Sequence, residues 1–222
     1  MCGIAGIYFF SAENASVKAE TNKITSALKH RGPDYQSSHS FKNCTLYHAR
    51  LTILDLSDDS NQPFLDASKQ KGLVYNGEIF NYKDLQEQVS DLKTKGDVEV
   101  LFKLFEKENI NCLDKLNGFF AFAFYDSQKD ELQVVRDRYG VKPVYYYYDK
   151  EKIAFASELK ALLELTGAQE LNYNALHTYL RLNYISGKET IFKNVFRLLP
   201  GEYISVKNKQ PVINTWYTIP VE

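Results

Sequence analysis

The chain has 222 residues, of which 44% are hydrophobic and 25% are charged, as is typical of a globular protein with a substantial core. Its formal net charge at pH 7 is −1. There is no excess of positive charge with which to bind nucleic acid or an anionic membrane. The composition therefore favours chemistry on a small molecule and excludes nucleic acid as an expected partner.

Three cysteines, Cys2, Cys44 and Cys112, form an odd set without metal-type spacing. This pattern argues against a disulfide framework or a metal site and indicates a reducing compartment. The apolar start of the chain is far shorter than the roughly 20 residues of a membrane span, and no basic segment precedes it. We therefore expect a cytoplasmic protein without a membrane partner.

The sequence begins Met-Cys-Gly-Ile-Ala-Gly. Methionine before a small residue is the usual target of N-terminal trimming, which would leave Cys2 as the first residue. Cys2 would then carry both a thiol nucleophile and an α-amino group whose pKa near ~7.8 suits a base. Apolar residues at positions 4–10 predict a strand that would hold this terminus inside the fold. A cysteine at position 2 often has no function, so the rest of the chain must distinguish a catalytic Cys2 from an incidental one.

Residues 17–28 show helical spacing of apolar side chains, and the pattern stops at the loop His30-Arg31-Gly32-Pro33-Asp34. Residues 44–54 predict a strand in which Arg50 has apolar neighbours. The guanidinium of Arg50 could hold a substrate carboxylate or form an internal ion pair, and the segment alone favours neither. Residues 55–72 are rich in polar residues and predict a long surface loop.

Residues 73–75 predict a short strand that runs into Asn76-Gly77-Glu78. An Asn-Gly pair is typical of a tight hairpin turn. However, Asn81 followed by Asp84 resembles a helix cap, which favours strand, Asn-Gly-Glu, helix. In that arrangement the Asn76 amide and the Gly77 N–H can stabilise an oxyanion, with Glu78 beside them.

Gly96-Asp97 opens an amphipathic helix whose apolar face includes Val98, Leu101 and Phe105. Asp97 is either an ordinary N-cap or a carboxylate that the helix dipole keeps ionised. In the second case it could pair with the ammonium group of a substrate.

From Gly118 the sequence predicts antiparallel strands at residues 119–125, 132–135, 145–148 and 152–156. The first of these is apolar on both faces, as expected of a strand between a second sheet and a helical layer. The charged corner at residues 137–143 is expected to brace a loop, and Ser157 to cap a short helix. Beyond Gly167 we expect a helix at residues 173–182, a turn at residues 199–201 and two short strands, forming an outer layer or a linker.

Together these segments resemble the glutamine-hydrolysing domain of the asparagine synthetase family, whose members are class II (N-terminal nucleophile) glutamine amidotransferases. The matching segments occur in family order across nearly the whole chain, and it is the ordered set that is specific. They are Met1-Cys2-Gly3-Ile4, His30-Arg31-Gly32-Pro33-Asp34, His48-Ala49-Arg50-Leu51, Asn76-Gly77-Glu78-Ile79, Gly96-Asp97, Gly118-Phe119-Phe120-Ala121-Phe122, Arg136-Asp137-Arg138 and Phe155-Ala156-Ser157-Glu158.

The resemblance implies an α+β fold, a four-layer αββα N-terminal nucleophile hydrolase sandwich in which two antiparallel sheets lie between helical layers. It also implies a glutaminase domain at residues 1–166 and a C-terminal extension at 167–222 that resembles the linker towards a synthetase domain. The implied roles cover one glutamine site: Cys2 as nucleophile, Asn76 and Gly77 as the oxyanion hole, Arg50 for the α-carboxylate, Glu78 and Asp97 for the α-ammonium, and backbone groups of Leu51 and Ile53 as pocket lining.

The sequence lacks the Ser-Gly-Gly-x-Asp-Ser loop through which the family's synthetase domain binds ATP, and Ser186-Gly187-Lys188 is not a P-loop. We therefore expect no cofactor here, and ATP and Mg only in a synthetase domain present in cis or in a partner chain. Whether the chain is truncated or a separate subunit stays open, as does a homodimer. The implied function is hydrolysis of glutamine to supply ammonia for asparagine synthesis. The alternatives are a glutaminase for another acceptor, such as a sugar or cell-envelope precursor, and a non-catalytic glutamine-binding module.

Overall fold

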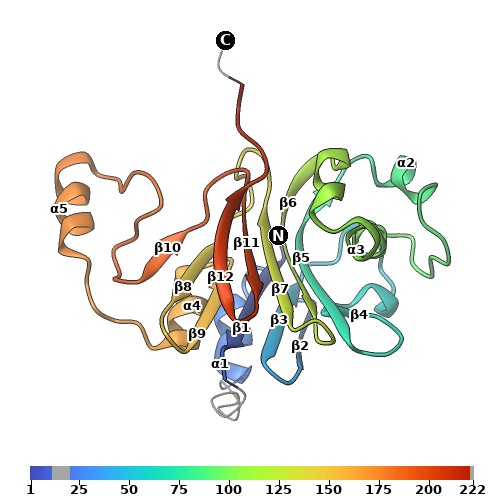
Figure 1. Cartoon of the computed structure of the whole chain (residues 1–222), viewed down its shortest axis with the longest axis horizontal. Coiled ribbons are helices and arrows are strands. Elements are labelled where there is room, and N and C mark those ends of the chain that lie inside the picture. Colours follow the sequence, from blue (N-terminus) through green and yellow to red (C-terminus); the bar gives the residue numbers. More distant parts are fainter. Residues whose placement is uncertain (12–20, 221–222) are drawn as a thin grey trace.

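The computed structural model describes residues 1–11 and 21–220 and contains short helices around two sheets (Figure 1). The helical elements are α1 (Thr21–Leu28), η2 (Asp58–Ser60), α2 (Tyr82–Gln86), α3 (Asp97–Glu108), η3 (Asn109–Lys115), α4 (Leu159–Thr166) and α5 (Tyr173–Leu182). The strands are β1 (Gly3–Phe9), β2 (Tyr35–Ser40), β3 (Cys44–Arg50), β4 (Phe64–Leu65), β5 (Lys71–Ile79), β6 (Gly118–Asp126), β7 (Glu131–Arg136), β8 (Tyr145–Tyr148), β9 (Lys152–Ala156), β10 (Val195–Arg197), β11 (Glu202–Lys207) and β12 (Gln210–Thr215).

The strands form two six-stranded sheets, each antiparallel throughout. The first, which we call sheet A, has the order β10-β8-β9-β1-β3-β2, and sheet B has the order β12-β11-β7-β6-β5-β4. β1 therefore lies at the centre of sheet A, between β9 and β3, although it is the first strand of the chain. This position holds the N-terminal residues inside the protein.

Three hydrophobic clusters define the expected αββα layers. One fills the space between the sheets, a second joins sheet B to α3 and η3, and a third joins sheet A to α1 and α4. In Figure 1, α3 lies beyond sheet B on the right, and α1 and α4 lie on the opposite side of the sandwich. The four-layer prediction is confirmed.

The sequence of β6 shows why sheet B is buried on both faces. Successive strand residues point to opposite faces of a sheet. Phe120, Phe122 and Phe124 lie in the cluster with α3, whereas Ala121 and Ala123 face sheet A. Large rings thus fill the space under the helices, and small methyl groups let the two sheets approach each other.

Several predicted boundaries were wrong for local reasons. The strand expected to end at Leu54 ends at Arg50, because the backbone beyond it contacts Cys2 and Asp34 rather than another strand. The strand expected at residues 73–75 extends to Ile79, pairing with β6 along its whole length, so Asn76-Gly77-Glu78 lies within a strand and not after one. The expected helix at residues 17–28 is described from Thr21 onwards, and its first residues lie outside the described part.

Two predicted helix caps also differ. Ser157 does not cap α4, whose N-cap is Glu158, because its hydroxyl accepts the N–H of Ile4 at 3.0 Å. Asn81 occupies the N-cap position of α2, but its side chain bonds Lys115 O and Asn117 N instead of the helix. Both side chains stabilise a junction between elements that are distant in sequence.

The segment beyond residue 167 contributes strands to both sheets. β10 pairs with β8 in sheet A, and β11 pairs with β7 in sheet B. Ile204 and Val206 of β11 are fully buried between the sheets, whereas α5 stands apart from the sandwich in Figure 1. The division after residue 166 stays a prediction, but these strands complete the sandwich.

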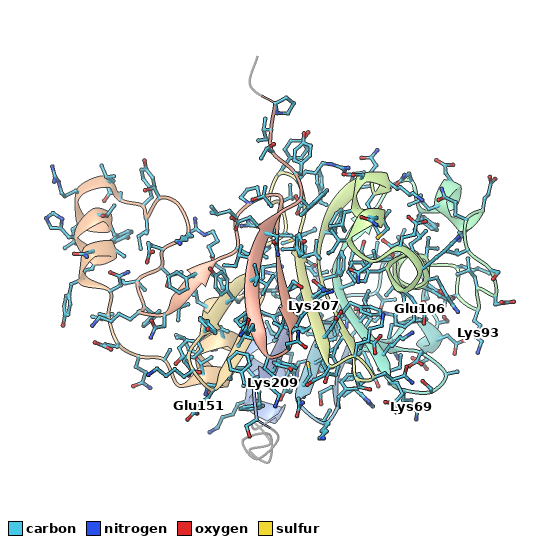
Figure 2. All side chains as sticks on the ribbon, in the orientation of Figure 1. Lys69, Lys93, Glu106, Glu151, Lys207 and Lys209 are labelled. Atoms are coloured by element: carbon cyan, nitrogen blue, oxygen red, sulfur yellow. The ribbon has the colours of Figure 1, made fainter. Side chains whose placement is uncertain are left out.

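The charged corner braces a loop, as expected. The carboxylate of fully buried Asp137 accepts three backbone N–H groups, and Arg136 donates to the carbonyls of Gly140, Lys142 and Leu198. Elsewhere, charges of both signs are interspersed on the surface, as the labelled side chains of Figure 2 illustrate. Within residues 1–11 and 21–220, no helix has the length and apolar character needed to span a bilayer.

Candidate active site

Cys2 lies at the start of β1, where several contacts fix the backbone. The main chain of Ile4 is bonded on both sides, with its N–H donating to the Ser157 hydroxyl and its carbonyl accepting the Ser157 N–H at 2.8 Å. The Nε of Arg31 donates to the Cys2 carbonyl at 3.0 Å. The thiol lies against Leu51, whose N–H is 3.4 Å from Sγ. The candidate nucleophile is therefore held by the first residues after β9 and β3 and by the side chain of Arg31.

The loop at residues 30–34 supports this arrangement. Arg31 also forms an ion pair with Glu158 at 2.9 Å, and the Asp34 carboxylate accepts the Thr52 N–H at 2.8 Å. Gly32 is required because a Cβ there would lie 2.2 Å from the carbonyl oxygen of Ala49. The loop thus positions both the Cys2 backbone and the segment that follows β3.

The edge of β5 explains the placement of Gly77. β4 covers this edge only at Gly72 and Leu73. Beyond that point the N–H of Tyr75 donates to Gln62 Oε1 at 2.6 Å, and the N–H of Ile79 donates to Asp97 at 3.0 Å. Backbone N–H groups along a strand point alternately to its two edges. The N–H of Gly77, two residues from both Tyr75 and Ile79, therefore points to the same edge as theirs.

The side chain of Asn76 points towards sheet A. Val74, two residues earlier, packs between the sheets, whereas Tyr75 packs towards α3. Asn76 is 1% exposed, and its Nδ2 has no hydrogen-bond partner within the described part of the chain. A buried amide donor without a partner costs free energy, of the order of 1–3 kcal/mol. Such a donor is suited to an acceptor that arrives with a substrate.

Gly77 has no room for a side chain. A Cβ at this position would lie 2.4 Å from the carbonyl oxygen of Phe119 and 2.8 Å from the ring of Tyr75. The residue after Asn76 must therefore be glycine for β5 and β6 to pair as they do.

Arg50 is buried and binds the loop that follows β3. Its guanidinium donates to the carbonyls of Asp55 and Ser57 and to the side-chain oxygen of Asn61. All three oxygens are neutral, so these contacts are not the internal ion pair that was one alternative. They orient the guanidinium without neutralising its charge.

Asp97 is the first residue of α3, and its N-cap is Gly96, so the N-cap alternative for Asp97 was wrong. Its carboxylate accepts the hydroxyl of Tyr75 at 2.6 Å and the N–H of Ile79. Burial raises the pKa of Asp97, and these hydrogen bonds oppose the rise. The backbone N–H of Asp97 at the helix terminus also lowers the pKa, but burial outweighs all of these contributions, and the two donors keep the carboxylate in one orientation. Glu78, nearby on β5, is exposed.

One cleft brings together all the residues predicted from the sequence: Cys2, Arg50, Leu51, Ile53, Asn76, Gly77, Glu78 and Asp97. The cleft has a volume of about 110 Å³. Its lining also includes residues that were not predicted, namely Met1, Leu54, Asp55, Ser60, Gln62, Tyr75, Gly96, Val98 and Lys142. Of these, Met1, Leu54, Tyr75, Gly96 and Val98 directly adjoin a predicted residue in the sequence, and this adjacency was the usable signal. Gln62 and Ser60 lie in a polar loop whose path the sequence did not indicate.

The electrostatics of Cys2 indicate a protonated thiol that needs a base. Burial raises the pKa of the thiol, while the Leu51 N–H, the charge of the amino terminus and Arg50 oppose the rise. A nucleophile in this state must lose its proton to a neighbour as it attacks. Within the described residues, no group of three or more His, Cys, Asp or Glu side chains could hold a metal ion to assist it.

Comparison with known proteins identifies the family. Residues 1–217 match the family described as "Glutamine amidotransferase domain". A Methanocaldococcus jannaschii protein named "Putative asparagine synthetase (glutamine-hydrolyzing) 2" is 39% identical over 89% of this chain and 42% of its own length. Asparagine synthetase B of Escherichia coli is 35% identical over 73% of this chain and 30% of its own length.

Solved structures agree on the fold. Glutamine phosphoribosylpyrophosphate amidotransferase from B. subtilis, complexed with ADP and GMP, has a TM-score of 0.66 at 18% identity and covers 98% of this chain and 50% of that one. The chain spans less than half the length of the curated relatives named above. It belongs to the class II glutamine amidotransferase domain family and has the N-terminal nucleophile hydrolase fold.

Proposed function

We propose that this chain hydrolyses the side-chain amide of glutamine to glutamate and ammonia, with Cys2 as the nucleophile. The observation that carries the proposal is the buried Asn76 amide, whose Nδ2 has no hydrogen-bond partner among the described residues and which lines the same cleft as Cys2. An oxyanion formed on attack by the thiol would supply the missing acceptor. The Gly77 N–H, on the open edge of β5, would be the second donor.

Removal of Met1 is part of this proposal. Met1 lines the cleft, and its Sδ lies 3.5 Å from Lys142 Nζ. Its loss would free space for substrate and convert the Cys2 nitrogen from a peptide N–H into an α-amino group. That group, with an ordinary pKa near ~7.8, could take the thiol proton and later pass it to the leaving ammonia.

The remaining residues would bind the α-substituents of glutamine. Arg50 offers a buried positive charge to the carboxylate, and Asp97 and Glu78 offer negative charge to the ammonium group. Backbone groups at Leu51 and Ile53 would complete the pocket. Water would then cleave the γ-glutamyl thioester and release glutamate. Because Cys2 acts as a free thiol, we also propose a reducing, cytoplasmic location.

Cys2→Ala should abolish glutamate release, because Cys2 is the one thiol among the described residues that line the cleft, and it should leave thermal unfolding unchanged. Cys112→Ala is the matched control, since Cys112 is a buried thiol packed beside α3. Glutamate release by purified variants, measured with an enzyme-coupled assay, distinguishes them. Glutaminase activity in Cys2→Ala would exclude the mechanism.

Asn76→Ala should lower kcat by roughly 10²-fold or more with a smaller change in KM, because the Asn76 amide binds the negative charge that develops on the oxygen only in the transition state. The measurement is steady-state kinetics at fixed pH. An increase in KM at constant kcat would show that Asn76 binds the ground state instead.

Asp97→Asn should mainly raise KM, because the ammonium group of glutamine is charged throughout the reaction. In the parent enzyme KM should also rise as the pH falls through the pKa of Asp97, since only the ionised carboxylate attracts the ammonium group. Burial raises that pKa, so the rise should begin at a higher pH than for an ordinary aspartate. The asparagine variant should lack this dependence, and an identical pH profile in both proteins would contradict the assignment.

We further propose that the ammonia passes to an asparagine synthetase-type domain, which would hold ATP and Mg. The support is the identity of the relatives and an exposed apolar surface beside the cleft. Phe80 and Phe119 are half exposed, with ring centroids 5.3 Å apart, and Phe119 pairs in register with Glu78. Tyr139 and Val141 are exposed next to cleft residue Lys142.

The purified 222-residue chain supplied with glutamine, aspartate and ATP should release glutamate but form no asparagine. Adding the synthetase part of a relative should yield ATP-dependent asparagine. Amino-acid analysis of the products measures both outcomes. Asparagine formed by the chain alone would contradict the proposal, and transfer to another acceptor only would favour the alternative glutaminase.

A further inference from the structure

The backbone of Tyr75 is held by two side chains from outside its own sheet. Its N–H donates to Gln62 Oε1 at 2.6 Å, and its carbonyl accepts from His48 Nε2 at 3.2 Å. In the described chain β4 reaches only to Leu73, so these two side chains replace a neighbouring strand at this position. A buried N–H or C=O without such a partner would be costly.

His48 reaches Tyr75 from sheet A. It lies on β3, pairs in register with Ile4 of β1, and is 0% exposed between the sheets. Burial lowers the pKa of His48 to about 3, so the ring is neutral at physiological pH. Because a carbonyl only accepts, the proton of the neutral ring must be on Nε2. The ring thus acts as a fixed hydrogen-bond donor and not as an acid or base.

Gln62 reaches the same residue from a loop that is also tied to sheet A. Its side chain is 6% exposed, and its backbone carbonyl accepts the hydroxyl of Ser37 on β2. The two side chains together form what we call the Tyr75 clamp. The clamp joins sheet A, which carries Cys2, to the open edge of β5 in sheet B.

The clamp lies beside the groups whose separation matters for the reaction. Tyr75 directly precedes Asn76 and Gly77. His48 precedes Leu51, whose N–H contacts Cys2 Sγ, by only three residues. A misplacement of about 1 Å between reacting groups can cost about 10²-fold in rate. The spacing of β3 and β5 at this point therefore sets the distance between nucleophile and oxyanion donors.

We propose that His48 and Gln62 are positioning residues for glutamine hydrolysis, which clamp the backbone of Tyr75 and so align the oxyanion donors Asn76 and Gly77 with Cys2. This inference rests on the glutaminase function proposed above. Both act through the backbone of Tyr75, and Gln62 also lines the cleft.

The test compares His48→Phe, His48→Gln and Gln62→Met in the trimmed chain. Phenylalanine and methionine keep the approximate volume but remove the donor and the acceptor, respectively. Glutamine at position 48 restores an N–H the same number of bonds from Cα as Nε2. The matched control is Gln133→Met. Gln133 is buried like Gln62, at 3% exposure, but it lies on β7 and bonds Ser205 away from the cleft.

His48→Phe and Gln62→Met should lower kcat by about 10- to 100-fold with KM within about twofold, since alignment is lost while substrate binding is kept. His48→Gln should recover part of kcat, and Gln133→Met should keep the parent value. Amide exchange at Tyr75 should also become faster in Gln62→Met. Circular dichroism and thermal unfolding verify that each variant is folded.

Parent kcat in a folded Gln62→Met variant would overturn the inference, and this variant decides the question if His48→Phe does not fold. Equal losses in Gln133→Met would also overturn it, because they would show a general effect of core substitutions. These outcomes are distinct from failure of the proposed function, which would appear as absent glutaminase activity in the parent chain.

Discussion

The position of Cys2, next to the N-terminus, determines the rest of the site. A chain terminus is ordinarily mobile, and a nucleophile there would not stay aligned with a substrate. Here β1 is the central strand of sheet A, and Ser157, Arg31 and Leu51 bond the backbone or thiol of the first residues. The ordered terminus is thus a consequence of building the sheet around it.

The second constraint is the short length of β4. Because β4 pairs with only two residues of β5, the N–H and C=O groups on that edge of β5 beyond Leu73 have no strand to bond. Gln62, His48 and Asp97 satisfy several of them. The same open edge leaves the Gly77 N–H facing the cleft. An interrupted sheet edge therefore provides both the oxyanion donor and the groups that hold it in place.

The sequence was sufficient to predict the fold class and eight residues of the cleft, because apolar patterns and ordered motifs are local signals. The apolar run of β6 indicated a strand buried on both faces, and Phe122 and Ala121 do pack in hydrophobic clusters on opposite faces of that strand. The predicted ends of strands were wrong where tertiary contacts decide where a strand ends. Asn-Gly at positions 76–77 resembles a turn, and only pairing with β6 keeps it extended. Gln62 was missed because its role depends on a loop path.

In the proposed mechanism Cys2 attacks glutamine once it is the first residue of the chain. The most direct measurement is labelling of the trimmed protein with a glutamine-like chloroketone, followed by peptide mapping and an assay of residual activity. We expect one label per chain, on Cys2, with loss of glutaminase activity in proportion to labelling and protection by glutamine. Labelling of Cys44 or Cys112 instead, or equal turnover by a chain that retains Met1, would contradict it.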